Sequence, residues 1–471
     1  MPMNKVVHAA QRAAFSAAID SAIKAVRGKG PENMAEQAVK LVNLAQPLLA
    51  HRYPDADWDK VRAFVSDPGS KWMEYAYKAI NEIDPHILKM NTLNLVYEGM
   101  FAGYNYVMEL RRKYDCNMPW ILLFDPTSAC NLHCKGCWAA EYGNKLNLSF
   151  DEIDSIIQQG KEMGTYFYIY TGGEPLVRKD LVELASHATS KGMRAVISTN
   201  GTLITKEKAR ELKGVGLSYV GISLDGMEEV HDRFRGVPGA FRKALEGVAN
   251  CQAEGLKVGL RFTINKRNVG EIPGIFRLLA DLEVPRACFY HLVYSGRGSE
   301  LIKEDLDHAE TRQVLDLIMD ETRALFDAGK PKEILTVDNH ADGPYVWMRM
   351  KREDPKRAEE IFELLQYNEG NNSGRGIGCI SWDGKVHADQ FWRNHTFGNV
   401  LERPFSEIWD DPNIELLHKM KNKKAYVKGR CASCRFLNIC GGNFRARAEA
   451  YYGDEWAQDP ACYLTDEEIG L

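Results

Sequence analysis

Three cysteines within one short segment constrain this chain most strongly: Cys130-Asn-Leu-His-Cys134-Lys-Gly-Cys137. The segment follows an apolar run at residues 120–124 that we expect to be a β-strand. Thiolates are soft ligands that suit iron–sulfur clusters or zinc. Three of them can bind three irons of a 4Fe–4S cube and leave the fourth iron open, as catalytic zinc sites keep one position free. The alternative is a structural zinc site in which His133 is the fourth ligand.

A second group of cysteines lies near the end of the chain, at Cys431, Cys434, Cys440 and Cys462. Four thiolates saturate a cluster, so we expect a redox or structural role for this group rather than substrate chemistry. A zinc site fits the count of ligands equally well. The remaining four of the 11 cysteines are isolated, and we expect them to be buried thiols.

Length and charge bound the class of protein. The 471 residues suffice for about three domains, and a net charge of −5 gives no basic field for nucleic acid. No apolar run is long enough to span a membrane. Residues 1–30 are Ala-rich but interrupted by charges, so they lack a signal-peptide core and we expect a cytoplasmic protein with reduced thiols.

From residue 120 onward, short apolar runs alternate with amphipathic segments, which predicts a parallel sheet of strand–helix units. Six such units predict an α/β fold with a partial, open (β/α)6 barrel, whose chemistry should lie at the C-terminal ends of the strands. The expected strands are residues 120–124, 166–170, 194–198, 219–223, 258–264 and 287–293. The expected domains are a helical N-terminal domain at 1–116, the barrel at 117–302, a helical connection at 303–375 and a cluster-binding domain at 376–471.

Polar residues follow three of the expected strands, the second, third and fourth. Paired glycines allow close backbone approach to a ligand, a carboxylate can pair with an ammonium group, and short polar side chains suit ribose hydroxyls or simple turns. An arginine on the fifth strand can bind a carboxylate or form a structural ion pair. These cofactor-binding candidates are Gly172, Gly173, Glu174, Ser198, Asn200, Ser223, Asp225 and Arg261.

The cysteine loop and these strand ends together resemble the radical S-adenosylmethionine (SAM) superfamily. The resemblance implies that a 4Fe–4S cluster on Cys130, Cys134 and Cys137 binds SAM and that its reductive cleavage gives a 5′-deoxyadenosyl radical. It also implies a low-potential electron donor of the ferredoxin or flavodoxin type. One departure is Gly136, where the family usually has an aromatic residue, so we expect the packing of adenine at this loop either to be altered or to be supplied by Trp138.

The second cysteine group resembles the SPASM domain of radical SAM enzymes, which carries auxiliary clusters. The two-cluster version has cysteines where this chain has Phe444 and Asp389. We therefore expect one auxiliary 4Fe–4S cluster on Cys431, Cys434, Cys440 and Cys462, and two clusters in all, with SAM as the third cofactor.

Residues 290–298, 337–345, 379–392 and 431–450 resemble the tetrapyrrole-processing radical SAM enzymes of haem and haem d1 biosynthesis. The resemblance implies that carboxylate side chains are removed from the periphery of a sirohaem-derived iron tetrapyrrole. Arginines could bind its carboxylates, histidines its iron, and Cys379 and Asp389 could line its cavity. The candidate arginines are Arg297, Arg375 and Arg393, and the candidate histidines are His291, His340, His387 and His395.

Two other functions remain open. A SPASM-type enzyme that modifies a peptide or protein side chain would keep the chemistry, although such members often carry a β-rich N-terminal module and this N-terminus is predicted to be helical. An iron–sulfur electron carrier is opposed by the three-cysteine loop, because a carrier gains nothing from an open iron.

Overall fold

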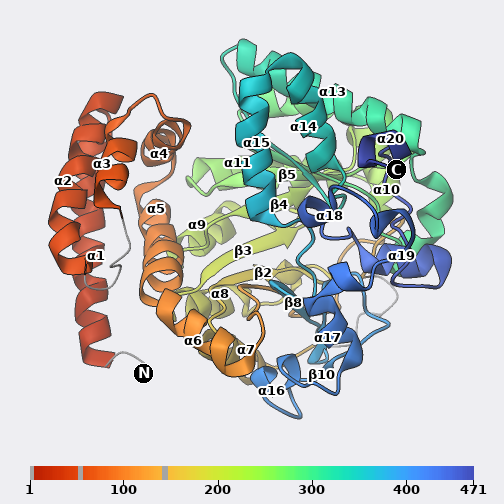
Figure 1. Ribbon diagram of the computed structural model, residues 1–471, viewed down its shortest axis with the longest axis horizontal. Helices are drawn as coiled ribbons and strands as arrows, with labels where there is room; N and C mark the ends of the chain where they lie inside the picture. The colour runs from red at the N-terminus through yellow and green to blue at the C-terminus, as the bar shows by residue number, and fades with distance from the viewer. Residues whose placement is uncertain (1–4, 51–56, 140–146) are drawn as a thin grey trace. The chain divides into compact units, whose positions relative to one another are not determined.

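The computed structural model describes residues 5–50, 57–139 and 147–471. The chain divides into two compact units, Met1–Tyr106 and Val107–Leu471 (Figure 1). Among the described residues, the helices are all too short or too polar to cross a membrane.

The first unit is helical over its described residues, as expected from the sequence. Asp57, Ser70 and Asp84 each accept hydrogen bonds from backbone N–H groups at the start of the following helix, which explains where three of these helices begin. Two small apolar clusters hold the helices together, one around Met34 and one around Ile23. The helices are α1 (Lys5–Val26), α2 (Pro31–Leu49), α3 (Trp58–Ser66), α4 (Lys71–Glu82), α5 (Pro85–Asn91) and the π-helix η1 (Thr92–Ala102), after which α6 (Tyr104–Tyr114) leads into the second unit.

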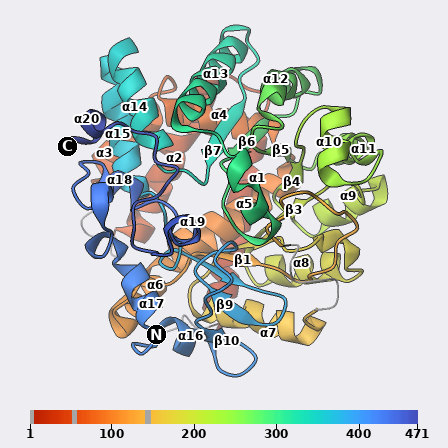
Figure 2. The same ribbon diagram turned by 90° about the vertical axis from the view of Figure 1, so that its right-hand side faces the viewer.

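The second unit is built on one curved sheet. Its strands follow the order β10-β9-β8-β1-β2-β3-β4-β5-β6-β7, and all neighbours from β8 to β7 are parallel. Figure 2 shows the strands in an arc with the helices α8 to α12 outside it. The strands are β1 (Ile121–Phe124), β2 (Phe167–Tyr170), β3 (Arg194–Thr199), β4 (Val220–Ser223), β5 (Val258–Thr263), β6 (Arg286–Tyr290), β7 (Glu333–Val337), β8 (Ile377–Ile380), β9 (Lys385–His387) and β10 (Gly398–Asn399).

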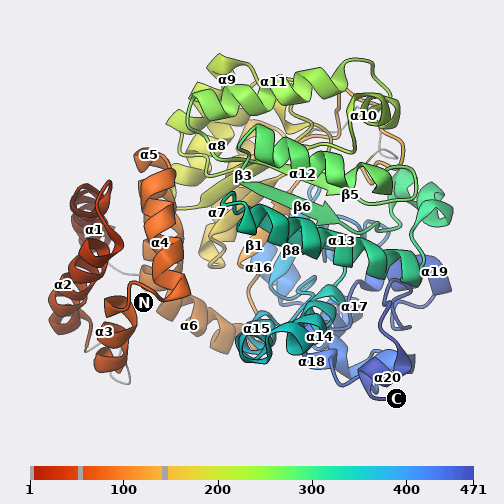
Figure 3. The ribbon, with the colours of Figure 1, turned by 90° about the horizontal axis from the view of Figure 1, so that it is seen from above.

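The helices that cover the sheet begin and end at residues with a clear local reason. Ser149 and Asp307 form capping boxes at the starts of α7 and α13, and Gly236 ends α10 in the left-handed conformation. The helices α12 and α13 pack side by side (Figure 3). The barrel helices are α7 (Phe150–Glu162), α8 (Leu181–Ser190), α9 (Lys206–Gly214), α10 (Glu228–Arg235), α11 (Ala240–Ala253), α12 (Ile272–Asp281) and α13 (His308–Asp327), with the short turns η3 (Pro175–Val177), η4 (Val269–Glu271) and η5 (Gly296–Glu304).

The expected strands are all present, and the α/β partial barrel is confirmed. The structure adds β7, which lies within the segment 303–375 where only helices were expected. It pairs in parallel with β6 from Arg286↔Glu333 to Tyr290↔Val337 and so extends the barrel beyond six strands. The reason it escaped prediction is its half-buried position at the edge of the sheet, which gives no continuous buried run.

The C-terminal part of the chain is joined to the barrel through β8, which pairs in parallel with β1 from Ile121↔Ile377 onward. A buried ion pair, Arg447 Nε to Asp459 Oδ1 at 2.8 Å, adds a second connection, since Arg447 also donates to the Leu292 carbonyl after β6. The elements of this part are α14 (Asp342–Glu353), α15 (Pro355–Asn368), α16 (Phe405–Trp409), α17 (Glu415–Lys421), η6 (Lys423–Ala425), η7 (Gly429–Cys431), α18 (Leu437–Cys440), α19 (Arg445–Tyr452) and α20 (Asp466–Ile469).

Candidate functional site

The cysteine loop after β1 lies against the loop after β2, and backbone hydrogen bonds join them. Glu174 N donates to Ala129 O at 2.7 Å, and Gly173 N donates to Thr127 O at 3.0 Å. A Cβ at residue 173 would lie 2.1 Å from Ala129 O, so only glycine permits this approach. The cysteines Cys130, Cys134 and Cys137 therefore line one cavity together with the predicted strand-end residues.

Glu174 fixes the position of the next strand end. Its buried carboxylate accepts from Leu176 N at 3.0 Å, from Thr199 Oγ1 at 2.6 Å and from Asn200 N at 2.7 Å. Burial raises the pKa of Glu174 above its usual value. Both carboxylate oxygens of Glu174 thus accept hydrogen bonds from the protein, and the side chain also lines the cavity. Glu174 therefore connects the ends of β2 and β3, in addition to its expected pairing with an ammonium group.

Ser198 and Arg261 form a second fixed contact in the cavity. The Arg261 guanidinium donates to Ser198 Oγ and lies 4.5 Å from the ring centroid of Tyr290. Asn200 donates to Asn131 Oδ1 at 2.8 Å and so ties the end of β3 to the cysteine loop. The predicted residues Ser198, Asn200 and Arg261 are therefore together at the carboxyl ends of the strands.

An arginine that the sequence analysis missed lies between Asp225 and the cysteines. Arg235 Nη2 is 2.5 Å from Asp225 Oδ2, and its Nη1 is 3.5 Å from Cys134 Sγ. Although burial disfavours its charge, Asp225 and Cys134 hold the pKa of Arg235 above its ordinary value. Arg235 ends α10, a helix without a recognisable motif, so only the three-dimensional contact identifies it. Ser223 and Asp225 line the same cavity.

Cys134 is buried, and Cys130 and Cys137 are partly buried. Burial raises the pKa of Cys130 to about 12, and burial also raises the pKa of Cys137. Iron–sulfur ligands must be thiolates, so a positive charge near them favours ligation. Arg235 supplies that charge, and three thiols around one cavity fit an iron–sulfur cluster with an open position.

The departure at Gly136 has a steric reason. Gly136 has φ +73°, and a Cβ there would lie 2.1 Å from Leu301 Cδ1. Leu301 thus occupies the space next to the loop that an aromatic side chain would need. Trp138 lines the cavity, where its ring meets Phe391 edge-on at 6.0 Å and lies under the Arg393 guanidinium at 4.9 Å.

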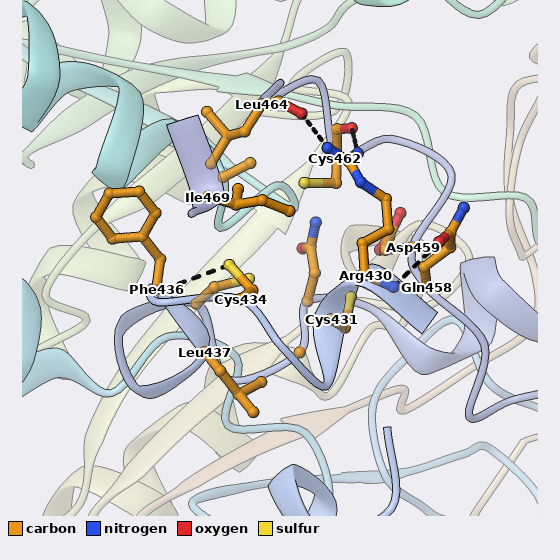
Figure 4. A pocket seen from close by; sticks show the side chains of 14 residues that line it. Arg430, Cys431, Cys434, Phe436, Leu437, Gln458, Asp459, Cys462, Leu464 and Ile469 are labelled. Carbon is orange, nitrogen blue, oxygen red and sulfur yellow. Dashed lines mark hydrogen bonds between the residues drawn. The ribbon is translucent and has the colours of Figure 1, made fainter. Parts of the chain in front are cut away.

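The second cysteine group also converges. Cys431, Cys434, Cys440 and Cys462 line one cavity with Phe436, Leu437, Leu464 and Ile469. Figure 4 shows this cavity with Cys431, Cys434 and Cys462 labelled. The Phe436 N–H donates to Cys434 Sγ at 3.3 Å, the kind of hydrogen bond that tunes cluster potentials. Burial raises the pKa of Cys462 to about 12. Four thiols in a largely apolar cavity fit a fully ligated cluster.

Three of the residues predicted to face the substrate have protein partners. Arg297 donates to the Cys134 carbonyl from Nε at 3.1 Å and from Nη2 at 2.8 Å, so its guanidinium stabilises the cysteine loop. Arg393 is buried in an ion pair with Asp125, and Arg375 pairs with Glu369. Contact of these arginines with a substrate remains a prediction.

The cysteine and aspartate expected to line the substrate cavity differ in position. Cys379 is fully buried within β8, and burial raises its pKa well above the ordinary value. Asp389 lines a second cavity, and its Oδ1 accepts from Phe391 N at 2.9 Å and from Trp392 N at 3.1 Å. Of the two, only Asp389 is among the residues that line this cavity.

The second cavity adjoins the one that contains the cysteines. The residues that line both are Ser198, Arg261, Tyr290, Asp338, Gln390 and Phe391. Asp338 follows β7 with φ +68°, and burial raises its pKa to about 7. A substrate in the second cavity would therefore lie next to whatever binds over the three cysteines.

Comparison with known proteins identifies the family. Residues 124–279 match the radical SAM superfamily, and residues 373–435 match the SPASM iron–sulfur cluster-binding domain. Fe-coproporphyrin III synthase of Methanosarcina barkeri is 58% identical over 357 residues, which cover 74% of this chain and 89% of that protein. The chain belongs to the radical SAM superfamily. Pre-heme d1 synthase of Dinoroseobacter shibae is 40% identical over 358 residues, covering 74% of this chain and 87% of that protein.

The fold agrees with this family. The structure of SuiB from Streptococcus suis bound to its precursor peptide SuiA has a TM-score of 0.64 and 17% identity, covering 90% of both chains. At that identity it shows a shared fold alone. The radical SAM and SPASM regions imply 4Fe–4S clusters and SAM binding, so the chain is a SAM-dependent enzyme.

Proposed function

We propose that this radical SAM enzyme removes peripheral carboxylate side chains from a sirohaem-derived iron tetrapyrrole in haem or haem d1 biosynthesis. The observation that carries the proposal is the 58% identity with Fe-coproporphyrin III synthase across 89% of that protein. Identity of this degree over nearly the whole relative supports the same class of substrate.

In this proposal the chain's own residues prepare the cysteine cavity for SAM. Cys130, Cys134 and Cys137 would hold a 4Fe–4S cluster, which would supply the electron for the reductive cleavage of SAM. Arg235 offsets the negative charge of the thiolates, because its Nη1 contacts Cys134 Sγ. The polar strand ends bind the rest of SAM: Gly172, Gly173, Glu174, Ser198, Asn200, Ser223, Asp225 and Arg261.

The second cysteine group binds one auxiliary 4Fe–4S cluster in this proposal. Four thiols line its cavity and leave no ligand position open for SAM. Phe444 stands where a further cysteine would be needed for a second auxiliary cluster, and its ring packs edge-on against Phe391 at 5.8 Å. The enzyme works in the cytoplasm with a low-potential donor of the ferredoxin or flavodoxin type.

The substrate occupies the second cavity. Arg261 reaches both cavities, and its fixed guanidinium offers a charge-assisted partner for a ring carboxylate. The amide-bearing residues Asn371 and Gln390 line the same cavity. The same cavity is also lined by aromatic side chains such as Phe391 and Phe444, so its walls suit a flat ring with polar groups at its periphery.

The test is anaerobic incubation of reconstituted enzyme with SAM, dithionite and 12,18-didecarboxysirohaem. Mass spectrometry follows loss of side-chain carbon, and chromatography follows 5′-deoxyadenosine. We expect both products from the parent chain and neither from Cys134→Ala. An unchanged tetrapyrrole beside vigorous 5′-deoxyadenosine release would refute the substrate and favour a peptide-modifying enzyme. Absence of 5′-deoxyadenosine from intact, iron-loaded protein would favour an electron carrier.

A further inference from the structure

His340 lies in the wall of the second cavity, directly after β7. It lines that cavity together with Asp338, Asp389 and Phe444. Its imidazole is half-buried, and the ring lies nearly parallel to the Phe444 ring, at 18° and 6.1 Å between centroids. The side chain is thus held against an aromatic surface on one side and is adjacent to open space on the other.

The backbone at His340 is fixed by hydrogen bonds to the cluster-binding part of the chain. His340 N donates to Asn443 Oδ1 at 3.0 Å, and Asn443 Nδ2 donates to Asn339 Oδ1 at 2.8 Å. Asn339 in turn donates to the Ala461 carbonyl at 2.8 Å. This network restricts where the imidazole can point, which is a requirement for a side chain that has to meet a ligand in one geometry.

The imidazole of His340 has no hydrogen bond to any residue in the described part of the chain. The other histidines considered for iron binding have protein partners. His291 Nε2 is 2.9 Å from Asp342 Oδ2, and His395 Nε2 is 2.7 Å from Glu449 Oε1. Both ring nitrogens of His387 are engaged, one by Ser381 Oγ and one by the His395 carbonyl. Among the described residues, His340 is therefore the one of these four histidines for which neither ring nitrogen has a hydrogen-bond partner.

The ring is also in the protonation state that metals bind. Burial, and after it the positive charge of Lys423, lower the pKa of His340 to about 4. The imidazole is consequently neutral near pH 7, and neutral imidazole is the form that ligates iron.

We propose that His340 is an axial ligand of the iron in the tetrapyrrole substrate. The inference rests on the proposed function, since it requires an iron tetrapyrrole in the second cavity. Because His340 is held between β7 and the cluster-binding part of the chain, its coordination to the iron would fix how far the tetrapyrrole plane lies from Phe444. It would also select the iron-bearing ring over the metal-free ring.

The experiment measures binding of the substrate rather than its conversion. Ferric 12,18-didecarboxysirohaem is titrated anaerobically into enzyme without SAM, and absorption and electron paramagnetic resonance spectra are recorded. We expect a nitrogen-ligand signature with the parent chain, its loss in His340→Ala, and its return when imidazole is added. Replacement of His418, an exposed histidine on α17, serves as the matched control and should leave the signature unchanged.

Affinity for the metal-free ring provides an independent measurement. Loss of a metal ligand should weaken binding of the iron-bearing ring by roughly tenfold or more, while binding of the metal-free ring stays nearly constant. Equal weakening of both rings would overturn the proposal, because it would indicate only lost packing.

A second measurement needs no substitution, in case His340→Ala fails to fold. Parent enzyme labelled with ¹⁵N-histidine is examined by pulsed electron paramagnetic resonance on the bound ferric ring. Histidine nitrogen coupling supports coordination, and its absence overturns it. If the parent enzyme converts the tetrapyrrole but no histidine coupling is seen, the assignment of His340 as the iron ligand is wrong while the proposed function is retained. If it neither binds nor converts the tetrapyrrole, the proposed function itself fails.

Discussion

The contact between Gly136 and Leu301 allows a quantitative test of the cysteine loop. In Gly136→Ala the new Cβ would lie 2.1 Å from Leu301 Cδ1, and the backbone has φ +73°. The left-handed conformation costs an L-residue about 1–2 kcal/mol, and overpacking costs about 1–3 kcal/mol. We therefore expect Gly136→Ala to destabilise the folded state by about 2–5 kcal/mol, which for a unit of this size lowers the melting temperature by roughly 2–10 °C.

A double-mutant cycle separates the two contributions. Leu301→Ala alone should cost about 2–5 kcal/mol through the cavity it leaves. The double variant lacks the clash, so its cost should fall below the sum of the single costs by about 1–3 kcal/mol. Anaerobic thermal unfolding and 5′-deoxyadenosine release are measured on all four proteins. Gly214→Ala is the control, because nothing lies within 4 Å of its Cβ position. Strictly additive costs would refute the steric reasoning.

Three further predictions concern buried charges. Arg235→Gln should lower the free energy of unfolding by about 3–5 kcal/mol, because it leaves Asp225 unpaired. It should also lower the iron content and the yield of 5′-deoxyadenosine, and full iron loading would contradict the proposed role of Arg235 beside Cys134. The pKa of Asp338 is raised to about 7, so the carboxylic acid adds stability at acidic pH that is lost as pH rises towards 7. Asp338→Asn should therefore be more stable than the parent by up to about 4 kcal/mol at about pH 8.5, and by less at about pH 5. If the gain in stability does not depend on pH, Asp338 does not titrate as proposed. Arg447→Met should lower the free energy of unfolding by about 3–5 kcal/mol, because it leaves the buried carboxylate of Asp459 without a partner. The melting temperature should fall, and adding Asp459→Asn to the same protein should partly restore it.

Much of the barrel could be predicted because its information is local. Buried parallel strands are continuous apolar runs, and the loops that follow them carry the glycines and polar groups at fixed places. The predicted strand at 194–198 is found as Arg194–Thr199, and that at 258–264 as Val258–Thr263. The cysteines could be assigned to two groups from spacing alone, and each group lines its own cavity.

The features that escaped prediction depend on contacts between distant segments. β7 is defined by its pairing with β6, and Arg235 by its position between Asp225 and Cys134. The segment 1–116 was predicted to be helical, but the π-helix Thr92–Ala102 within it was not distinguished, because its altered hydrogen bonding leaves no mark in helical periodicity. Arg297 was assigned to substrate from its type, whereas its partner, the Cys134 carbonyl, is set by the tertiary fold.

The pairing of β8 with β1 has a consequence for biosynthesis. On the ribosome, β1 emerges early, and its outer edge has no partner until Ile377 has been made. A nascent chain with an exposed parallel-strand edge is slow to fold and prone to pair with other chains. A truncated gene that ends before β8 would leave this edge permanently open, so aggregation rather than a soluble barrel is the expected fate of such a fragment.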